Sequence, residues 1–142
     1  MREFRTDSEE ETIALGERLA RELPRPATVL LIGNLGTGKT TLAKGIVKGL
    51  GVAPPEEVSS PTFTLVHEYG APPRVYHVDL YRLDTEREVA TLGLDDIFDK
   101  HGVVLIEWGE RFPALMPAAR IEVRLEHAGE DARRIRVTEI RP

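Results

Sequence analysis

Apolar residues along the chain form two kinds of run, unbroken and alternating. The runs at 28–32 and 103–107 are almost wholly apolar, a pattern typical of strands buried on both faces of a sheet. We expect these two strands to be parallel neighbours. Alternating apolar and charged residues at 121–125 and 135–137, on either side of a turn at 128–131, predict a half-exposed hairpin at the end of the chain.

Helical periodicity is clearest near the start of the chain. Residues 8–11 form a capping box, and the leucines that follow recur on one helical face at Leu15, Leu19 and Leu23. A short strand is expected before this helix, at 1–6.

The middle of the chain predicts a second hairpin and two short helices. Strands are expected at 64–69 and 75–80, joined by a turn at 70–73. A capping box at 85–88 begins a short helix, and residues 95–100 favour another helical turn. We expect both helices to be surface elements.

The segment after the first unbroken run carries the most specific motif in the chain. It matches the pattern G-x-x-x-x-G-K-[ST], and a helix is predicted directly after it, over 39–50. Glycines allow successive main-chain N–H groups to turn into one concavity that holds a phosphate, and the helix dipole favours the same anion. The expected nucleotide-binding residues are Gly33, Asn34, Leu35, Gly36, Thr37, Gly38, Lys39, Thr40 and Thr41. Among them, Lys39 is predicted to reach the β- and γ-phosphates, and Thr40 to offer its hydroxyl to Mg²⁺.

Acidic residues at strand ends are candidates to complete such a site. Glu107 ends the second unbroken run and is the better candidate for a metal-side role; Asp79 is the second. The alternative for either acid is a structural role, in which it caps a helix or pairs with Arg82 or Arg111. Thr62 lies where nucleotide hydrolases place a switch-loop hydroxyl, although a simple proline turn also accounts for it. His77 shares a strand face with Asp79, and Trp108 is either a packing residue or a contact surface beside the site.

Composition limits the classes of function. The 142 residues predict one domain spanning 1–142, and the absence of cysteine excludes disulfides and cysteine-based chemistry. A net charge of -5 with scattered basic residues does not indicate a nucleic-acid-binding face, so any role of RNA is expected to come through a partner. No signal sequence and no apolar run of about 18 residues occurs, which favours a soluble cytoplasmic protein without a membrane role.

The order of several short segments resembles that of the TsaE family, small bacterial P-loop ATPases required for making threonylcarbamoyladenosine on transfer RNA. The segments that carry this resemblance are 33–41, 60–66, 77–83, 92–94, Glu107-Trp108 and Glu110. Together they span nearly the whole chain. Two positions depart from the family pattern: Val78 stands where phenylalanine is usual, and Gly109 replaces a frequent proline.

The resemblance implies a fold, an activity and partners. It implies an α/β fold, a P-loop NTPase-like three-layer core with a mixed parallel and antiparallel sheet. The implied activity is ATP hydrolysis with magnesium, and the implied partners are the TsaB and TsaD pair, with transfer RNA engaged indirectly through that complex. Lys39 would act on the phosphates, Thr40 and Glu107 on magnesium, and the motifs around the active site would contribute Thr62, Asp79 and Trp108.

Alternative functions remain open at this point. A small-molecule P-loop kinase would share the loop but should carry an arginine-rich lid, and a GTPase should carry an N/T-K-x-D motif that does not occur here. A nucleotide-gated adaptor would bind ATP without requiring its hydrolysis. No arginine is unambiguously placed to stabilise the transferred phosphoryl group; Arg82, Arg87 and Arg111 are candidates, and slow hydrolysis by the isolated chain is therefore expected. Contacts to the base are expected outside the loop, near 6–9 or around Arg133.

Overall fold

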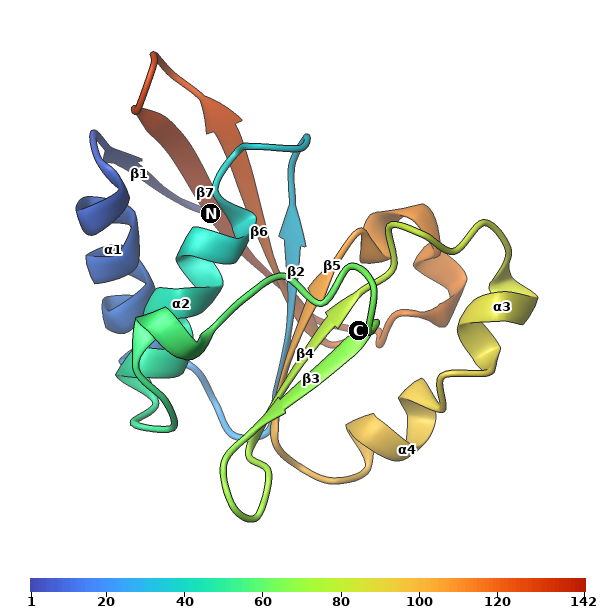
Figure 1. Ribbon diagram of the computed structural model, residues 1–142. Helices are drawn as coiled ribbons and strands as arrows, with labels where there is room; N and C mark the ends of the chain where they lie inside the picture. Colours follow the sequence, from blue (N-terminus) through green and yellow to red (C-terminus); the bar gives the residue numbers. More distant parts are fainter.

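A mixed sheet of seven strands runs through the middle of the computed structural model, which describes residues 1–142 (Figure 1). The strands are β1 (Arg2–Thr6), β2 (Ala27–Ile32), β3 (Val66–Tyr69), β4 (Val75–Asp79), β5 (Val103–Glu107), β6 (Arg120–His127) and β7 (Arg133–Ile140). Their order across the sheet is β1-β7-β6-β2-β5-β4-β3.

The centre of the sheet is parallel and its margins are antiparallel. β2 lies between β5 and β6 and is parallel to both, and β4 is parallel to β5 on the far side. β7 is antiparallel to β6 and to β1, and β3 is antiparallel to β4. The predicted parallel pairing of the two unbroken apolar runs is confirmed, and so are both predicted hairpins.

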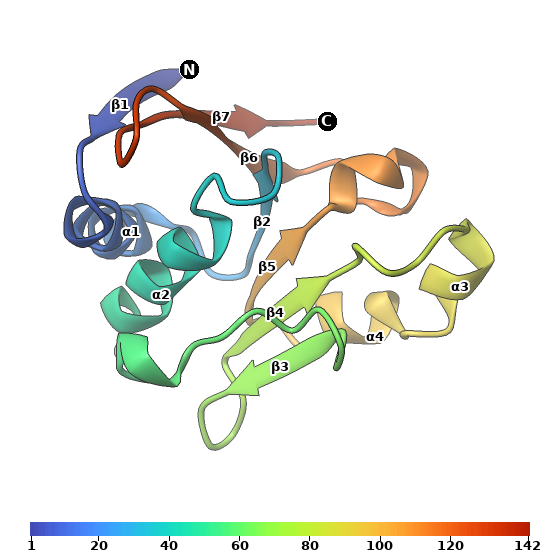
Figure 2. The same ribbon diagram turned by 45° about the horizontal axis from the view of Figure 1, so that its top comes forward.

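Helices cover both faces of the sheet, which gives three layers (Figure 2). The helices are α1 (Glu9–Glu22), α2 (Lys39–Gly49), α3 (Glu86–Ala90) and α4 (Leu94–Phe98), with 3₁₀ turns η1 (Pro55–Glu57), η2 (Gly109–Arg111) and η3 (Pro113–Leu115). α1 and α2 pack on one face, whereas α3, α4, η2 and η3 lie on the other. The predicted three-layer α/β fold with a mixed sheet is confirmed. No helix is both long enough and apolar enough to cross a membrane.

Alternate residues of β2 supply the two hydrophobic cores. Val29 and Leu31 pack with α1 and α2, and Leu30 and Ile32 pack with the elements on the opposite face. This two-sided burial explains why the strand is apolar at successive positions rather than at every second one.

The packing of α1 against α2 depends on small residues. A Cβ at Gly45 would lie 2.1 Å from the carbonyl oxygen of Ile13, and one at Gly16 would lie 2.6 Å from that of Leu42. Since real Cβ atoms do not approach backbone so closely, glycine at these positions allows the two helices to touch.

Four details differ from the sequence prediction. β3 begins only at Val66, because Leu65 has a left-handed φ of 71° and its N–H donates to Pro61 O. The last residue of the predicted strand at 75–80 lies outside β4. Leu23 follows α1 as its C-cap instead of lying on its face. The two short helices lie at the surface as expected, but each also has a buried face, because Val89 in α3 and the apolar residues of α4 pack into the second core.

Candidate functional site

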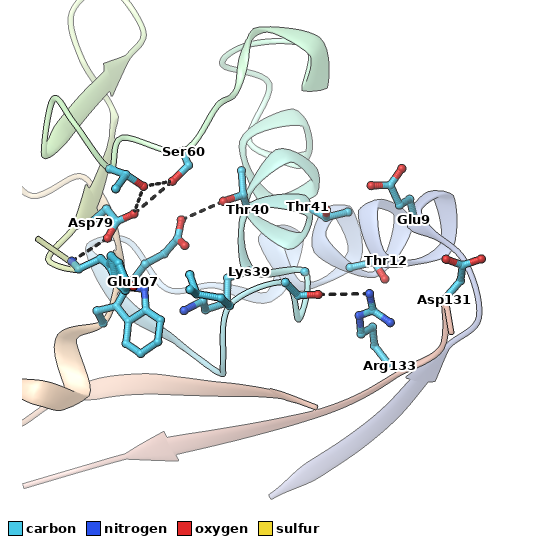
Figure 3. A pocket seen from close by; sticks show the side chains of 16 residues that line it. Glu9, Thr12, Lys39, Thr40, Thr41, Ser60, Asp79, Glu107, Asp131 and Arg133 are labelled. Carbon is cyan, nitrogen blue, oxygen red and sulfur yellow. Dashed lines mark hydrogen bonds between the residues drawn. The ribbon is translucent and has the colours of Figure 1, made fainter. Parts of the chain in front are cut away.

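A cleft of about 410 Å³ opens at the carboxyl ends of the central parallel strands (Figure 3). β2, β4 and β5 end at this edge, so the loop after β2 and the acids that end β4 and β5 come together here. The cleft continues past the loop to the start of α1 and the β6–β7 turn, where it is lined by Glu9, Thr12, Asp131 and Arg133. The regions suggested for base contacts therefore border the same cleft; the contacts themselves stay a prediction.

The loop between β2 and α2 has the backbone that a phosphate cradle requires. Gly36 and Gly38 have left-handed φ values of 79° and 98°, which side chains other than glycine rarely adopt. Gly33 is needed for a different reason, because a Cβ there would lie 2.6 Å from Leu125 O. Thr37 Oγ1 donates to Asn34 O at 2.7 Å and holds the turn together. The residues at this loop thus fit a polyphosphate.

Lys39 is buried at the floor of the cleft. Its Nζ donates to Gly33 O at 2.7 Å and lies 3.6 Å from the centroid of the Trp108 ring. Burial lowers the pKa of Lys39 below its usual value, and the nearby carboxylates of Glu107, Glu110 and Asp79 oppose that shift. The ammonium group therefore lies in a poorly solvated position beside the loop.

Thr40 and Glu107 face each other across the cleft. Thr40 Oγ1 donates to Glu107 Oε2 at 3.2 Å, and Glu107 as a residue is 3 % exposed. A hydroxyl and a carboxylate are hard oxygen donors, which suit Mg²⁺. The structure holds no cluster of three or more His, Cys, Asp or Glu residues able to bind a metal alone. Mg²⁺ in nucleotide sites commonly takes one or two carboxylates and completes its shell with phosphates and waters, so this pair fits such an ion.

Asp79 holds the loop that precedes β3. Its Oδ2 accepts hydrogen bonds from Thr62 Oγ1 at 2.9 Å and Ser60 Oγ at 3.1 Å, while Oδ1 accepts from the Tyr81 N–H at 2.9 Å. Thr62 therefore lines the cleft. Asp79, Thr62, Lys39, Thr40 and Glu107 all line one site, and their catalytic and metal-binding roles stay predictions.

The arginine contacts differ from those that the sequence suggested. Arg111 donates to Tyr81 O at 2.9 Å, and the Arg82 guanidinium lies 5.1 Å from the centroid of the Phe63 ring. Neither these two nor Arg87 lines the cleft, whereas Arg133 does. Arg133 Nε donates to Thr37 O at 3.0 Å and Nη2 to Gly36 O at 3.3 Å.

Sequence reasoning missed three contacts at the site. These are the Ser60 bond to Asp79, the Arg133 bonds to the loop, and a hydrogen bond of 2.6 Å between His77 Nε2 and Glu107 Oε2. The Ser60 bond could have been suspected, because the segment at 59–64 is rich in hydroxyl side chains. No local signal predicts the second, because Arg133 lies 96 residues from Thr37 in sequence.

A family model and the sequences of known proteins point to the same family. The family model described as "Threonylcarbamoyl adenosine biosynthesis protein TsaE" matches residues 6–135. The chain is 41% identical over 140 residues to the tRNA threonylcarbamoyladenosine biosynthesis protein TsaE of Bacillus subtilis, which covers 96% of this chain and 85% of that protein. It is 35% identical over 130 residues to the TsaE protein of Treponema pallidum, covering 92% of this chain and 95% of the relative.

A solved structure shares the architecture. The crystal structure of Bacillus subtilis YdiB superposes with a TM-score of 0.76 and 34% sequence identity, covering 98% of this chain and 85% of that one.

Proposed function

The chain belongs to the TsaE family of threonylcarbamoyl adenosine biosynthesis proteins, and from this premise we propose that it binds and hydrolyses ATP with magnesium. Its general role is in the biosynthesis of threonylcarbamoyladenosine on transfer RNA. One observation carries the proposal: the glycine-turned loop, the buried Lys39 ammonium and the Thr40–Glu107 pair line a single cleft (Figure 3).

Each group in the cleft has a distinct task in this proposal. Main-chain N–H groups of the loop and the start of α2 bind the phosphates, and Lys39 exchanges Gly33 O for a phosphate oxygen. Thr40 and Glu107 hold the metal side of the nucleotide. Mg²⁺ bound there would neutralise charge that develops on the phosphate oxygens. Asp79 keeps Thr62 at the cleft, where its hydroxyl is in place to orient a water.

The hydrolysis is proposed to be slow in the isolated chain and to be regulated by docking on the TsaB and TsaD pair. Arg111 is already committed to main-chain carbonyls, and Arg82 packs on Phe63 away from the cleft. Leu35, which lines the cleft, is 63% exposed, and Phe63, in the loop that carries Thr62, is 82% exposed; exposed apolar side chains of this kind suit a surface that a protein partner covers. The net charge of -5 agrees with indirect engagement of transfer RNA.

ATP turnover by the isolated chain, with and without TsaB and TsaD, tests the proposal. We expect slow hydrolysis alone and a faster rate with the pair. Glu107→Gln should reduce turnover at least about tenfold, because a metal ion contributes several kcal/mol of charge stabilisation to the reaction. Glu57→Gln, in the exposed η1 turn, is the matched control and should leave turnover unchanged.

Two results would change the conclusion. Failure of the wild-type chain to bind MgATP by calorimetry would exclude the nucleotide function altogether. If Glu107→Gln lost turnover but still supported transfer RNA modification, hydrolysis would be incidental and the nucleotide-gated adaptor would be the better description.

A further inference from the structure

His77 is a buried polar side chain that the proposed function leaves without a task. It lies in the middle of β4, is 0% exposed, and points to the same side of the sheet as the neighbouring acid Asp79. Its Nε2 lies 2.6 Å from Glu107 Oε2. Because an ionised carboxylate only accepts hydrogen bonds, the imidazole nitrogen is the donor.

The hydrogen bonds to Glu107 are arranged asymmetrically. Both the His77 Nε2–H and the Thr40 hydroxyl donate to Oε2, at 2.6 and 3.2 Å. The second oxygen, Oε1, receives no hydrogen bond from the chain, although Glu107 lines the cleft. One oxygen is therefore held by two hydrogen bonds from the chain, and the other by none.

Packing alone does not account for a histidine at this position. The flanking core residue on the same face of β4 is Val75, and the β5 residue in register with His77 is Leu105, so an apolar side chain would fit its surroundings. The histidine also leaves its Nδ1 buried without a hydrogen-bond partner. An unpaired buried polar atom is unfavourable, so the bond to Glu107 is the evident gain from having histidine here.

We propose that His77 is a positioning residue that fixes the Glu107 carboxylate so that its free oxygen engages the magnesium ion of the bound nucleotide. The inference rests on the proposed magnesium nucleotide site and adds a specific role to it. Carboxylates that bind metals are commonly held by a hydrogen bond from a neighbouring side chain, and loss of that bond typically lowers metal affinity or activity about 10- to 100-fold. His77 itself contacts neither metal nor nucleotide in this arrangement.

The test compares ATP binding with and without magnesium in two substitutions. His77→Phe removes the donor and keeps a ring, whereas His77→Gln places an amide N–H the same number of bonds from the backbone. His67→Phe is the control, since His67 lies opposite His77 in the β3–β4 register but contacts Tyr69 and not the cleft. Calorimetry measures the dissociation constant for ATP in EDTA and then in saturating Mg²⁺, after thermal scans confirm that each variant is folded.

His77→Phe should bind ATP in EDTA like the wild type, because the loop and Lys39 are unchanged, while the gain in affinity from Mg²⁺ falls about tenfold or more. His77→Gln should restore most of that gain, and His67→Phe should keep all of it. Equal weakening with and without Mg²⁺, or His77→Gln behaving like His77→Phe, would show a merely structural histidine and overturn the inference. A wild-type chain that binds no MgATP would instead defeat the proposed function itself.

Discussion

Substitution of Arg133, the arginine that lines the cleft, tests whether side-chain contacts from outside the phosphate-binding loop keep that loop ordered. From the start of β7 Arg133 donates to Thr37 O at 3.0 Å and to Gly36 O at 3.3 Å, and its Nη1 donates to Ala132 O at 2.9 Å within the adjoining turn. Arg133→Ala removes both bonds to the loop and leaves every residue of the motif in place.

The size of the effect follows from these two bonds. A hydrogen bond that involves a charged group contributes about 1.5–3 kcal/mol net, and the half-buried position of Arg133 favours the lower end. The longer bond, to Gly36 O, contributes less, so together they order the loop by about 2 kcal/mol. In Arg133→Ala, the binding of ATP must itself order the loop, and this costs half or more of the roughly 2 kcal/mol that was lost. The variant should therefore bind ATP more weakly by about 1–2 kcal/mol, or roughly 5- to 30-fold.

Calorimetric titration with MgATP measures this change directly. Arg133→Lys keeps the charge but not the planar fork of donors, so its affinity should fall between those of the wild type and Arg133→Ala. Arg134→Ala is the matched control, because Arg134 is the next residue, is exposed and pairs with Glu3 on β1. If Arg133→Ala bound MgATP within about twofold of the wild type, the loop would be ordered without this arginine and the reasoning would be refuted.

Three further predictions concern two buried ionisable groups at the site, Lys39 and Glu110, and the close contact of α1 with α2 at Gly45. Burial lowers the pKa of Lys39 below its usual value of 10.5, so its charge is lost at a lower pH than that of an ordinary lysine. MgATP affinity, measured by calorimetry at rising pH, should therefore fall before an ordinary lysine would titrate. Burial raises the pKa of Glu110 in the folded protein above its usual value of 4.5. Below pH 4.5 the group is protonated in both the folded and the unfolded chain and costs nothing, but the folded protein loses stability as pH rises through the raised pKa and the buried carboxyl has to ionise. Glu110→Gln should accordingly raise the thermal midpoint at about pH 7 and not at about pH 4, and an equal gain at both would contradict this. Gly45→Ala should lower the free energy of unfolding by about 3 kcal/mol or more in denaturant titrations, because its Cβ would lie 2.1 Å from Ile13 O; an unchanged midpoint would show that α1 and α2 separate without cost.

Local chemistry accounts for the parts of the fold that sequence could predict. The phosphate-binding loop, the strand before it and the helix after it are all encoded within 28–50, and their residue types report backbone conformation directly. The unbroken apolar run at 103–107 likewise indicated a strand buried on both faces of the sheet. The capping box at Thr85 was confirmed in full, because its two reciprocal hydrogen bonds involve residues only three positions apart.

Other features depend on contacts that no local pattern contains. The alternation at 121–125 predicted a strand with one buried face, but not that β6 would lie parallel beside β2 and extend the central sheet. Leu65 was expected to be in a strand on its residue type, yet a bond from its N–H to Pro61 O and a φ of 71° hold it in a turn. At Leu65 the hydrogen bonding of the loop that contains Thr62 therefore determines the backbone conformation, against the preference of leucine in this pattern for a strand.

The two strand-end acids show why sequence could bring the candidate residues to one edge of the sheet and could not give the contacts between them. Asp79 and Glu107 are in register on adjacent parallel strands, so both were bound to reach the same edge of the sheet. Which hydroxyls each would meet depends on distant segments: Asp79 binds those of Ser60 and Thr62, and Glu107 binds that of Thr40. Both oxygens of Asp79 are occupied by the chain, whereas Glu107 keeps one free. That difference favours Glu107 for the metal side of the proposed site and leaves Asp79 to hold the hydroxyl-bearing loop against it.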